Sequence, residues 1–336
     1  MLYRIDEVLE LKRRLGIKEA AEKAYDIRLD EIAKSGRWPY RIAASLFGFL
    51  YFSILVVVGN LLPKRRVTKQ TAAIIKDLAV RFSHIPEILI FKGIELEAAC
   101  SRNYAGKGLD IGCGNGYTGA VLMQNAGRGE LHGIDRSIYF DSWNSHKTFV
   151  AGDARNLPYA NASFDFAVCL GVLDHIYEVE RALSEIVRTL KPGGHLTFAI
   201  QTAHFRESTL WYRVYRALGL HVKANKFQDY RDVYDIIYHY RTEAEWRKVL
   251  ADAGFAEVEV SYIFSDRNLM LYDLLNIQTY YLRFFFANHA MRMLARRPVL
   301  AKLIGRAAYR IAGRALKHRA TPQNATRYFI RATKAS

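Results

Sequence analysis

The residues best suited to chemistry are glycines and acids between residues 110 and 153. Gly112, Gly114 and Gly116 follow an apolar run at alternate positions. Glycine allows a sharp backbone turn and lets a ligand approach where a Cβ would clash. Asp135 lies 19 residues after Gly116, where a carboxylate can accept both hydroxyls of a ribose, and Asp153 follows 18 residues later, near where a nucleobase would lie. The pattern therefore predicts a site for a nucleoside-containing ligand.

Elements that could position these residues begin near residue 105, where short apolar runs alternate with helical periods. The predicted strands are residues 108–112, 130–135, 147–152, 164–170 and 195–200. Helices lie between them, notably residues 177–190, for which Lys191-Pro192-Gly193-Gly194 is the stop signal. This alternation predicts βαβ units and a parallel sheet covered on both faces. The acids would then share the sheet edge at which such folds bind ligands.

Four motifs carry a family resemblance: LDIGCGNG at 109–116, GID at 133–135, GDARNLPYANASFDFAVC at 152–169 and RTLKPGGHLTFAI at 188–200. In this order and at this spacing, they resemble the class I S-adenosylmethionine-dependent methyltransferases of the small-molecule type, which have a Rossmann-like fold. The spacing GxGxG, rather than GxGxxG, distinguishes them from the nicotinamide-binding proteins. The resemblance covers residues 106–200 closely.

The resemblance implies a role for each matching residue of the cofactor site. Gly112, Gly114 and Gly116 would pack against the methionine part of S-adenosylmethionine. Asp110 would hold the turn and, directly or through water, the amino group of the cofactor. A purely loop-capping carboxylate is the alternative, and the two roles are compatible. The remaining implied contacts are Asp135 with the ribose, Asp153 and Ala154 with the adenine, and Leu170 and Gly171 with the sulfonium side. No metal ligand is implied, and three scattered cysteines predict neither a metal site nor a disulfide framework.

Methyl transfer from a sulfonium depends mainly on alignment of the nucleophile and exclusion of water. A hydroxyl acceptor also needs a general base. His175 is the first candidate, with Asp174 as its orienting partner or substitute, because the family often places histidine after the fourth strand. The sequence here is Asp-His rather than His-His, and capping of the following helix is an alternative role for the pair. His204 is a weaker candidate.

An aromatic insertion at residues 201–241 occupies the place where the family covers its acceptor. Its aromatic residues are Trp211, Tyr212, Tyr215, Tyr230, Tyr234, Tyr238 and Tyr240. They predict either a lid over an apolar or sugar acceptor or an ordinary core. No Asn-Pro-Pro-Tyr or Asp-Pro-Pro-Tyr element follows residues 164–170, which argues against methylation of a DNA base. A helix at 242–253 and a strand at 256–263 should follow, with a last, antiparallel strand at 326–332.

The ends of the chain hold its charge. Lys and Arg number 49 against 33 Asp and Glu, a net charge of +16, yet residues 67–263 are close to neutral. Residues 42–62 contain 21 residues without a charge, flanked by basic residues on both sides. A helix of that length reaches about 30 Å, enough to cross a bilayer core. It predicts a membrane anchor, either spanning or monotopic, with a helix buried in the protein as the alternative.

A second basic region, residues 264–336, has 14 basic and 2 acidic side chains. Within residues 298–319, Lys302, Arg306, Arg310 and Arg314 recur at four-residue steps opposite an apolar side. Such a helix suits an anionic membrane surface, and the aromatic run at 280–286 would add interfacial anchors. A solvated cationic face and RNA binding are the alternatives.

These observations predict a seven-stranded, mostly parallel α/β sheet with helices on both faces. The predicted regions are 1–66 with its anchor, a methyltransferase core at 67–263, a basic helical insertion at 264–325, and the last strand and C-terminus at 326–336. The predicted function is S-adenosylmethionine-dependent methyl transfer to oxygen or carbon of a lipid-linked or amphipathic acceptor. The enzyme would work at the cytosolic side of a membrane. An RNA methyltransferase and a cofactor-binding scaffold subunit are the competing hypotheses.

Overall fold

A computed structural model describes residues 50, 53–54, 56–63, 68–82, 86–136, 146–275, 298–315 and 320–336. The charged leader, about half of the predicted anchor 42–62 and the aromatic run 280–286 lie outside the described residues. The chain divides into two compact units. One is drawn from Met1–Ile94, Arg206–Ile237 and Ser265–Arg319, and the other from Glu95–Phe205, Tyr238–Phe264 and Ala320–Ser336.

The second unit is built on a seven-stranded sheet of order β3-β2-β1-β4-β5-β7-β6. The pairs from β3 through β5 are parallel, and β7 runs antiparallel to β5, as the sequence predicts. The strands are β1 Tyr104–Ile111, β2 Gly127–Asp135, β3 Thr148–Ala151, β4 Phe164–Leu170, β5 Leu190–Gln201, β6 Phe255–Ser265 and β7 Ala325–Lys334.

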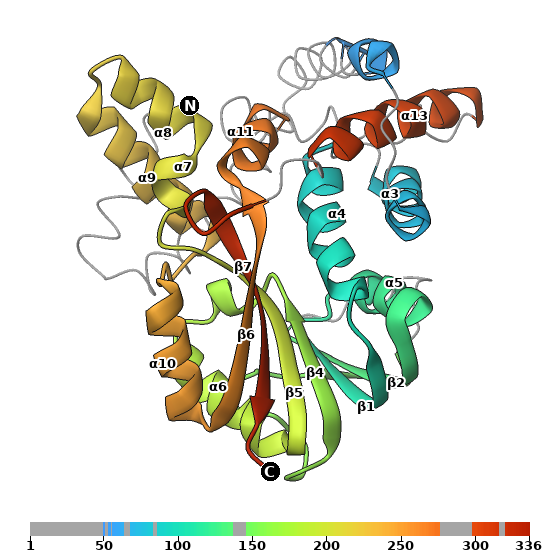
Figure 1. Cartoon of the computed structure of the whole chain (residues 1–336), viewed down its shortest axis with the longest axis vertical. Helices are drawn as coiled ribbons and strands as arrows, with labels where there is room; N and C mark the ends of the chain where they lie inside the picture. The colour runs from blue at the N-terminus through green and yellow to red at the C-terminus, as the bar shows by residue number, and fades with distance from the viewer. Residues whose placement is uncertain are drawn as a thin grey trace, which may run out of the picture. The chain divides into compact units, whose positions relative to one another are not determined.

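Helices cover both faces of this sheet (Figure 1). The helices α6 Val179–Thr189 and α10 Glu243–Ala253 lie on one face, and α5 Tyr117–Ala126 lies on the other. Trp246 of α10 is fully buried, and its ring meets Phe198 of β5 edge-on at 5.7 Å between centroids. Truncating such a side chain costs about 3–5 kcal/mol of stability. The main core therefore lies between α6, α10 and the sheet.

Local sequence explains where α10 begins and ends. The Thr242 hydroxyl accepts a hydrogen bond from the Glu245 N–H, and the Glu245 side chain accepts one from the Thr242 N–H, which forms a capping box. Gly254 ends the helix in the left-handed conformation, with φ of 105°. The predicted helix 242–253 is therefore confirmed to within one residue.

The junction of α6 and β5 differs from the prediction. The helix ends at Thr189, and β5 begins at Leu190, so Lys191-Pro192-Gly193-Gly194 lies in the strand rather than in a turn. Leu190 pairs with Phe164 of β4, and the register shifts before the next pair, Phe166 with His195. This irregularity in the ladder accommodates the proline and the glycines, because some residues of a β-bulge make no hydrogen bond to the neighbouring strand.

The first unit is helical within its described residues. It contains α3 Lys69–Phe82, α8 Leu210–Ala217, α9 His221–Asp235, α11 Asp266–Leu275 and α13 Pro298–Ala315, and most of α4 Pro86–Cys100. The chain also contains two shorter elements, the helix α7 Phe205–Ser208 and the 3₁₀ turn η1 Leu173–His175. The turn η1 belongs to the second unit.

A buried ion pair links three helices of the first unit. The Arg231 guanidinium of α9 lies 2.9 Å from the Asp273 carboxylate of α11, and both side chains are buried. The Leu210 N–H at the start of α8 donates to the same carboxylate at 2.8 Å. Burial raises the pKa of Asp273, and the neighbouring Arg231 opposes that rise. Removing Arg231 would leave a buried charge unpaired, at a cost of about 3–5 kcal/mol.

The predicted basic amphipathic helix forms α13, which ends at Ala315 within the described residues. Among the residues that the structure describes, no helix combines the length and the apolar content needed to cross a bilayer.

Candidate active site

A glycine turn connects β1 to α5 at the carboxyl edge of the sheet. Gly112, Gly114 and Gly116 have φ of 71°, 51° and 80°, which non-glycine residues rarely adopt. A Cβ on Gly112 would lie 2.2 Å from the Val172 side chain, so the turn passes close to the segment after β4. Above Gly114, in contrast, no described atom lies within 4 Å of the position of a Cβ. The turn is therefore tightly supported at Gly112 and open at Gly114.

Asp135 supports this turn from the neighbouring strand. Its Oδ2 accepts a hydrogen bond from the Gly114 N–H at 2.8 Å. In the ladder, Asp135 at the end of β2 pairs with Ala151 of β3, while Asp110 of β1 pairs with Gly133 of β2. The parallel register thus brings the predicted acids to one edge of the sheet. A carboxylate held in this way is oriented before any ligand arrives.

A buried histidine that the sequence did not reveal holds Asp110. The His146 Nε2 lies 2.9 Å from the Asp110 Oδ2, and both side chains are buried. Three glycines make room for the imidazole ring, because a Cβ on Gly116, Gly119 or Gly133 would lie only 3.2, 2.5 or 3.1 Å from its atoms. We call these three glycines and His146 the histidine socket. The histidine socket shares Gly116 with the glycine turn, and its imidazole holds the Asp110 carboxylate in place.

The signal for this socket in the sequence was weak. His146 is a single histidine in an unpatterned stretch, 36 residues from Asp110. Gly119 was the better clue, because glycine within a helix is unfavourable by about 1 kcal/mol relative to alanine and so needs a reason.

Asp153 follows β3, and its carboxylate pairs with Arg155. The Arg155 Nε lies 3.0 Å from Oδ1, and the Arg155 Nη2 lies 2.7 Å from Oδ2. The Arg155 Nη1 donates to Glu178 at 2.7 Å, so the guanidinium is held from two sides. Hydrogen bonding by Arg155 lowers the pKa of Asp153 to about 2. The carboxylate is therefore charged at any physiological pH, while Ala154 packs against the core.

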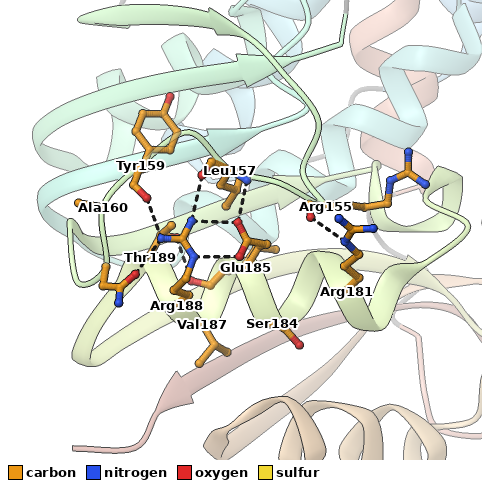
Figure 2. A network of polar contacts seen from close by, with 12 residues as sticks. Arg155, Leu157, Tyr159, Ala160, Arg181, Ser184, Glu185, Val187, Arg188 and Thr189 are labelled. Carbon is orange, nitrogen blue, oxygen red and sulfur yellow. Dashed lines mark hydrogen bonds and ion pairs between the residues drawn. The ribbon is translucent and has the colours of Figure 1, made fainter.

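The loop that carries Asp153 is fastened to α6 by a polar network (Figure 2). The Arg188 guanidinium donates to the Tyr159 carbonyl at 2.7 Å and to the Leu157 carbonyl at 2.9 Å. The same guanidinium pairs with Glu185, whose other carboxylate oxygen accepts from the Leu157 N–H at 2.8 Å. Because these bonds hold backbone groups, they fix the course of the loop rather than one side chain.

The two residues predicted to face the sulfonium lie where β4 ends. Leu170 is the buried last residue of β4, and Gly171 follows with φ of 72°. The predicted catalytic pair comes next, in η1, but its members lie in different environments. Asp174 is buried and His175 is exposed. Burial raises the pKa of Asp174, which Arg327 and His175 oppose by attraction. The catalytic assignment of both residues stays a prediction.

An ion pair between Arg327 of β7 and Glu95 of α4 lies near Asp174. The Arg327 Nη2 is 3.2 Å from the Glu95 Oε1, and both side chains are buried. The attraction of Arg327 and the repulsion of Glu95 both affect the pKa of Asp174. Two carboxyl groups thus share the field of one guanidinium in the interior. Such an arrangement supports the carboxyl end of β4 and the amino end of β7, and it leaves little freedom to change either charge.

Aromatic and imidazole groups border η1 on the segment 238–240. The Tyr238 N–H donates to the Asp174 carbonyl at 2.9 Å, and the Tyr177 and Tyr238 rings meet edge-on with centroids 5.5 Å apart. The His239 Nε2 lies 2.7 Å from the Ile176 carbonyl and must donate to it. Burial lowers the pKa of His239, so its imidazole is neutral and serves as a donor. Sequence reasoning counted Tyr238 in the aromatic insertion and missed His239.

The other predicted residues of the aromatic insertion divide between the two units. Tyr240 stacks on Phe205 in the second unit, with ring centroids 6.0 Å apart. Trp211, Tyr212, Tyr215, Tyr230 and Tyr234 belong to the first unit. His204 is exposed in the loop after β5.

Comparison with known proteins agrees with this geometry. Residues 109–198 match the family model of a methyltransferase domain. The chain is 28% identical over 134 residues to the mitochondrial 2-methoxy-6-polyprenyl-1,4-benzoquinol methylase of Xenopus laevis, a match that covers 38% of this chain and 42% of that protein. It is 27% identical over 168 residues to a demethylmenaquinone methyltransferase of Staphylococcus aureus, covering 46% of this chain and 69% of that protein.

Among solved structures, one match is the phosphoethanolamine N-methyltransferase 2 of Haemonchus contortus in complex with S-adenosyl-L-methionine, with a TM-score of 0.43 and 17% identity. The match covers 82% of this chain and 61% of that one.

A sheet of this order, with a glycine turn after β1 and an acid at the end of β2, defines a Rossmann-like fold that binds a nucleoside-containing ligand. Residues 109–198 form a methyltransferase domain, and this domain is of the class I S-adenosylmethionine-dependent type. S-Adenosylmethionine is the cofactor of this domain, and the open turn at Gly114 fits it, since a Cβ there would fill the space that the ligand needs.

Proposed function

We propose that the whole chain transfers a methyl group to a quinol-type or similar amphipathic acceptor at a membrane surface. Both named curated relatives act on quinone-type molecules, and this observation carries the acceptor class. The match spans less than half of the Xenopus protein, so the acceptor class is a proposal for this chain.

The cofactor would lie over the glycine turn, with its ribose on Asp135 and its adenine beside Asp153 and Ala154. Asp135 is held by the Gly114 N–H and Asp153 by Arg155, so both carboxylates are ordered in advance. When bound, the cofactor supplies a methyl group on a sulfonium, which is a good leaving group. The protein's own contribution is then to position the acceptor and to exclude water.

The acceptor would lie beyond Leu170 and Gly171, along the aromatic border of η1. Tyr177 and Tyr238 offer ring faces and edges to a planar, apolar molecule, because aromatic pairs favour edge-on and offset contacts. As the acceptor carbon or oxygen forms its bond to the methyl carbon, the methyl–sulfur bond breaks. The acceptor's proton must then pass to a base. The exposed His175 is the proposed base, and the buried Asp174 would act on it by charge.

Membrane association at the cytosolic side is part of the same proposal. A quinone-type acceptor with a long apolar tail resides in a bilayer, so its enzyme must work at the bilayer surface. The uncharged segment 42–62 and the basic helix α13 support this placement.

The decisive experiment follows a radiolabelled methyl group from S-adenosylmethionine. The purified full chain is supplied with a reduced demethylated quinol in vesicles, and separately with total RNA. Label is expected in the organic extract of the quinol reaction. Asp135→Ala should lose it, while Asp252→Ala, an exposed acid paired with Lys248 on α10, should retain it. Label in RNA, or none in quinol from a chain that binds S-adenosylhomocysteine, would refute the proposed acceptor.

A further inference from the structure

An apolar stripe lies exposed on the helical segment around residues 53–61. Residues 50, 53–54 and 56–61 are helical, and five large apolar side chains among them are between 47% and 78% exposed. They are Leu50, Ile54, Val57, Val58 and Leu61. Their positions, i, i+4, i+7, i+8 and i+11, place them on one face of a helix. Soluble monomeric proteins rarely expose large contiguous apolar patches, and such patches mark sites for a protein or membrane partner.

The opposite side of the same segment is fixed to α13. A Cβ on Gly59 would lie 2.6 Å from the Ala307 Cβ, so the two backbones approach as closely as glycine allows. The Asn60 amide donates to the Leu303 carbonyl at 3.0 Å, and the Arg310 guanidinium donates to the Asn60 carbonyl. These contacts orient the segment, so the apolar stripe faces away from α13.

The α13 helix adds positive charge beside this stripe. Residues 298–315 contain four basic and no acidic side chains, and Lys302 and Arg306 are exposed. Lys302 directly precedes Leu303, and Arg306 directly precedes Ala307. Leu303 and Ala307 contact the helical segment. If the segment crossed a bilayer, α13 and these two cations would have to enter the hydrocarbon with it, which is costly. If it lay in the bilayer plane, the cations could remain at the headgroups.

We propose that the apolar stripe docks in the plane of a bilayer that contains anionic lipids, with Lys302 and Arg306 on the lipid phosphates. The inference rests on the proposed function only in that the acceptor resides in a membrane. A second copy of the chain is a poorer occupant. A two-fold contact through the same patch would bring the cations of both copies together, whereas anionic lipid complements them.

The test is co-flotation of the purified full chain with preformed vesicles. One set contains phosphatidylcholine with phosphatidylglycerol, and the other contains phosphatidylcholine alone. The stripe variant is Ile54→Gln with Val57→Gln and Leu61→Gln, and it should lower binding to both sets at least about tenfold. Its matched control, Leu218→Gln with Val222→Gln, changes equally exposed apolar residues outside the stripe and should bind as the parent does.

The charge variant, Lys302→Gln with Arg306→Gln, separates lipid charge from apolar contact. It should lose about thirtyfold in binding to the anionic vesicles and almost nothing on neutral ones, because each cation near a charged surface contributes separately. An unchanged circular dichroism spectrum and melting temperature show that each variant is folded, because the changed residues belong to the helical unit and the cofactor site does not. Bound parent protein should also be released by alkaline carbonate, as in-plane proteins are.

Several results would overturn the inference. These are no parent binding to either vesicle, full binding by the stripe variant, or resistance to carbonate, which indicates spanning. A parent dimer that the stripe variant converts to a monomer, without lipid binding, would assign the stripe to a second copy. Failure of quinol methylation alone, with vesicle binding as expected, would refute the proposed acceptor and leave the docking surface standing.

Discussion

Gly119 offers a test in which two physical effects predict opposite signs. It lies in α5, and replacing a helical glycine by alanine ordinarily stabilises a protein by up to about 1 kcal/mol. Here, however, the new methyl carbon would lie 2.5 Å from the His146 Cε1 and 2.6 Å from the Asp110 Oδ2. Real carbon atoms do not approach so closely, so Gly119→Ala must displace the histidine or the carboxylate.

The magnitude follows from how little either neighbour can move. The His146 side chain is fully buried, bonded to Asp110 on one side and in contact with the Phe149 ring, whose centroid is 4.7 Å away, on another. Overpacking costs about 1–3 kcal/mol. Disturbing the buried hydrogen bond costs about 1–3 kcal/mol more. After subtracting the gain in helix propensity, we expect a net destabilisation of about 1–5 kcal/mol. For a unit of this size, that lowers the melting temperature by about 2–20 °C.

The assay is thermal unfolding followed by circular dichroism, with titration of S-adenosylhomocysteine by calorimetry. Gly119→Ala should melt lower and bind the ligand about tenfold more weakly, because the turn that receives it loses its support. Gly305→Ala is the matched control, since its methyl group would meet no described atom within 4 Å in α13. It should leave stability unchanged or slightly raised. If Gly119→Ala also raised the melting temperature, the histidine socket would not be the constraint inferred here.

Three further predictions concern charged groups. Arg155 lowers the pKa of Asp153 to about 2, so the stability from this pair is present above the unfolded pKa of Asp153 and is lost as pH falls toward 2. Arg155→Met should move the titration of Asp153, followed by carboxyl NMR, back toward its ordinary range, and an unmoved titration would contradict the pairing. Burial raises the pKa of Asp174, so its contribution to the free energy of unfolding is present at low pH and declines as pH rises through the folded pKa. Asp174→Asn should flatten this decline when the free energy of unfolding is measured across pH, and an unchanged slope would contradict the raised pKa. Arg327→Met should lower the free energy of unfolding in urea by about 3–5 kcal/mol, because it leaves the Glu95 carboxylate without this partner. Adding Glu95→Gln should recover part of that loss, and no recovery would mean that the two side chains do not act as a pair.

Periodic features of the sheet could be predicted from the sequence because they depend on local pattern. The strand 164–170 has the same bounds in the structure, and the antiparallel last strand is confirmed. The glycine turn and the edge position of Asp135 followed from spacing alone. The start of β5 did not, because Leu190 looks helical locally and is drawn into the sheet by pairing with Phe164.

Side-chain partners across long sequence separations were beyond reach. His146 meets Asp110 across 36 positions, and Arg327 meets Glu95 across 232. Neither pair has a periodic signature, because each depends on where the sheet and its helices place two backbones. The unequal burial of Asp174 and His175 has the same origin, since adjacent residues in a tight helical turn point in different directions.

The position of β7 has a consequence for the order of folding. β7 lies between β5 and β6, so β6 has no partner in the sheet until a strand some 60 residues further along the chain has arrived. The intervening stretch includes α11 and α13, which belong to the helical unit. On the ribosome, β5 and β6 must therefore wait with exposed edges while that stretch is synthesised, and pairing of such distant segments is slow. Completion of the catalytic sheet is thus tied to prior synthesis of the stretch that carries the basic helix.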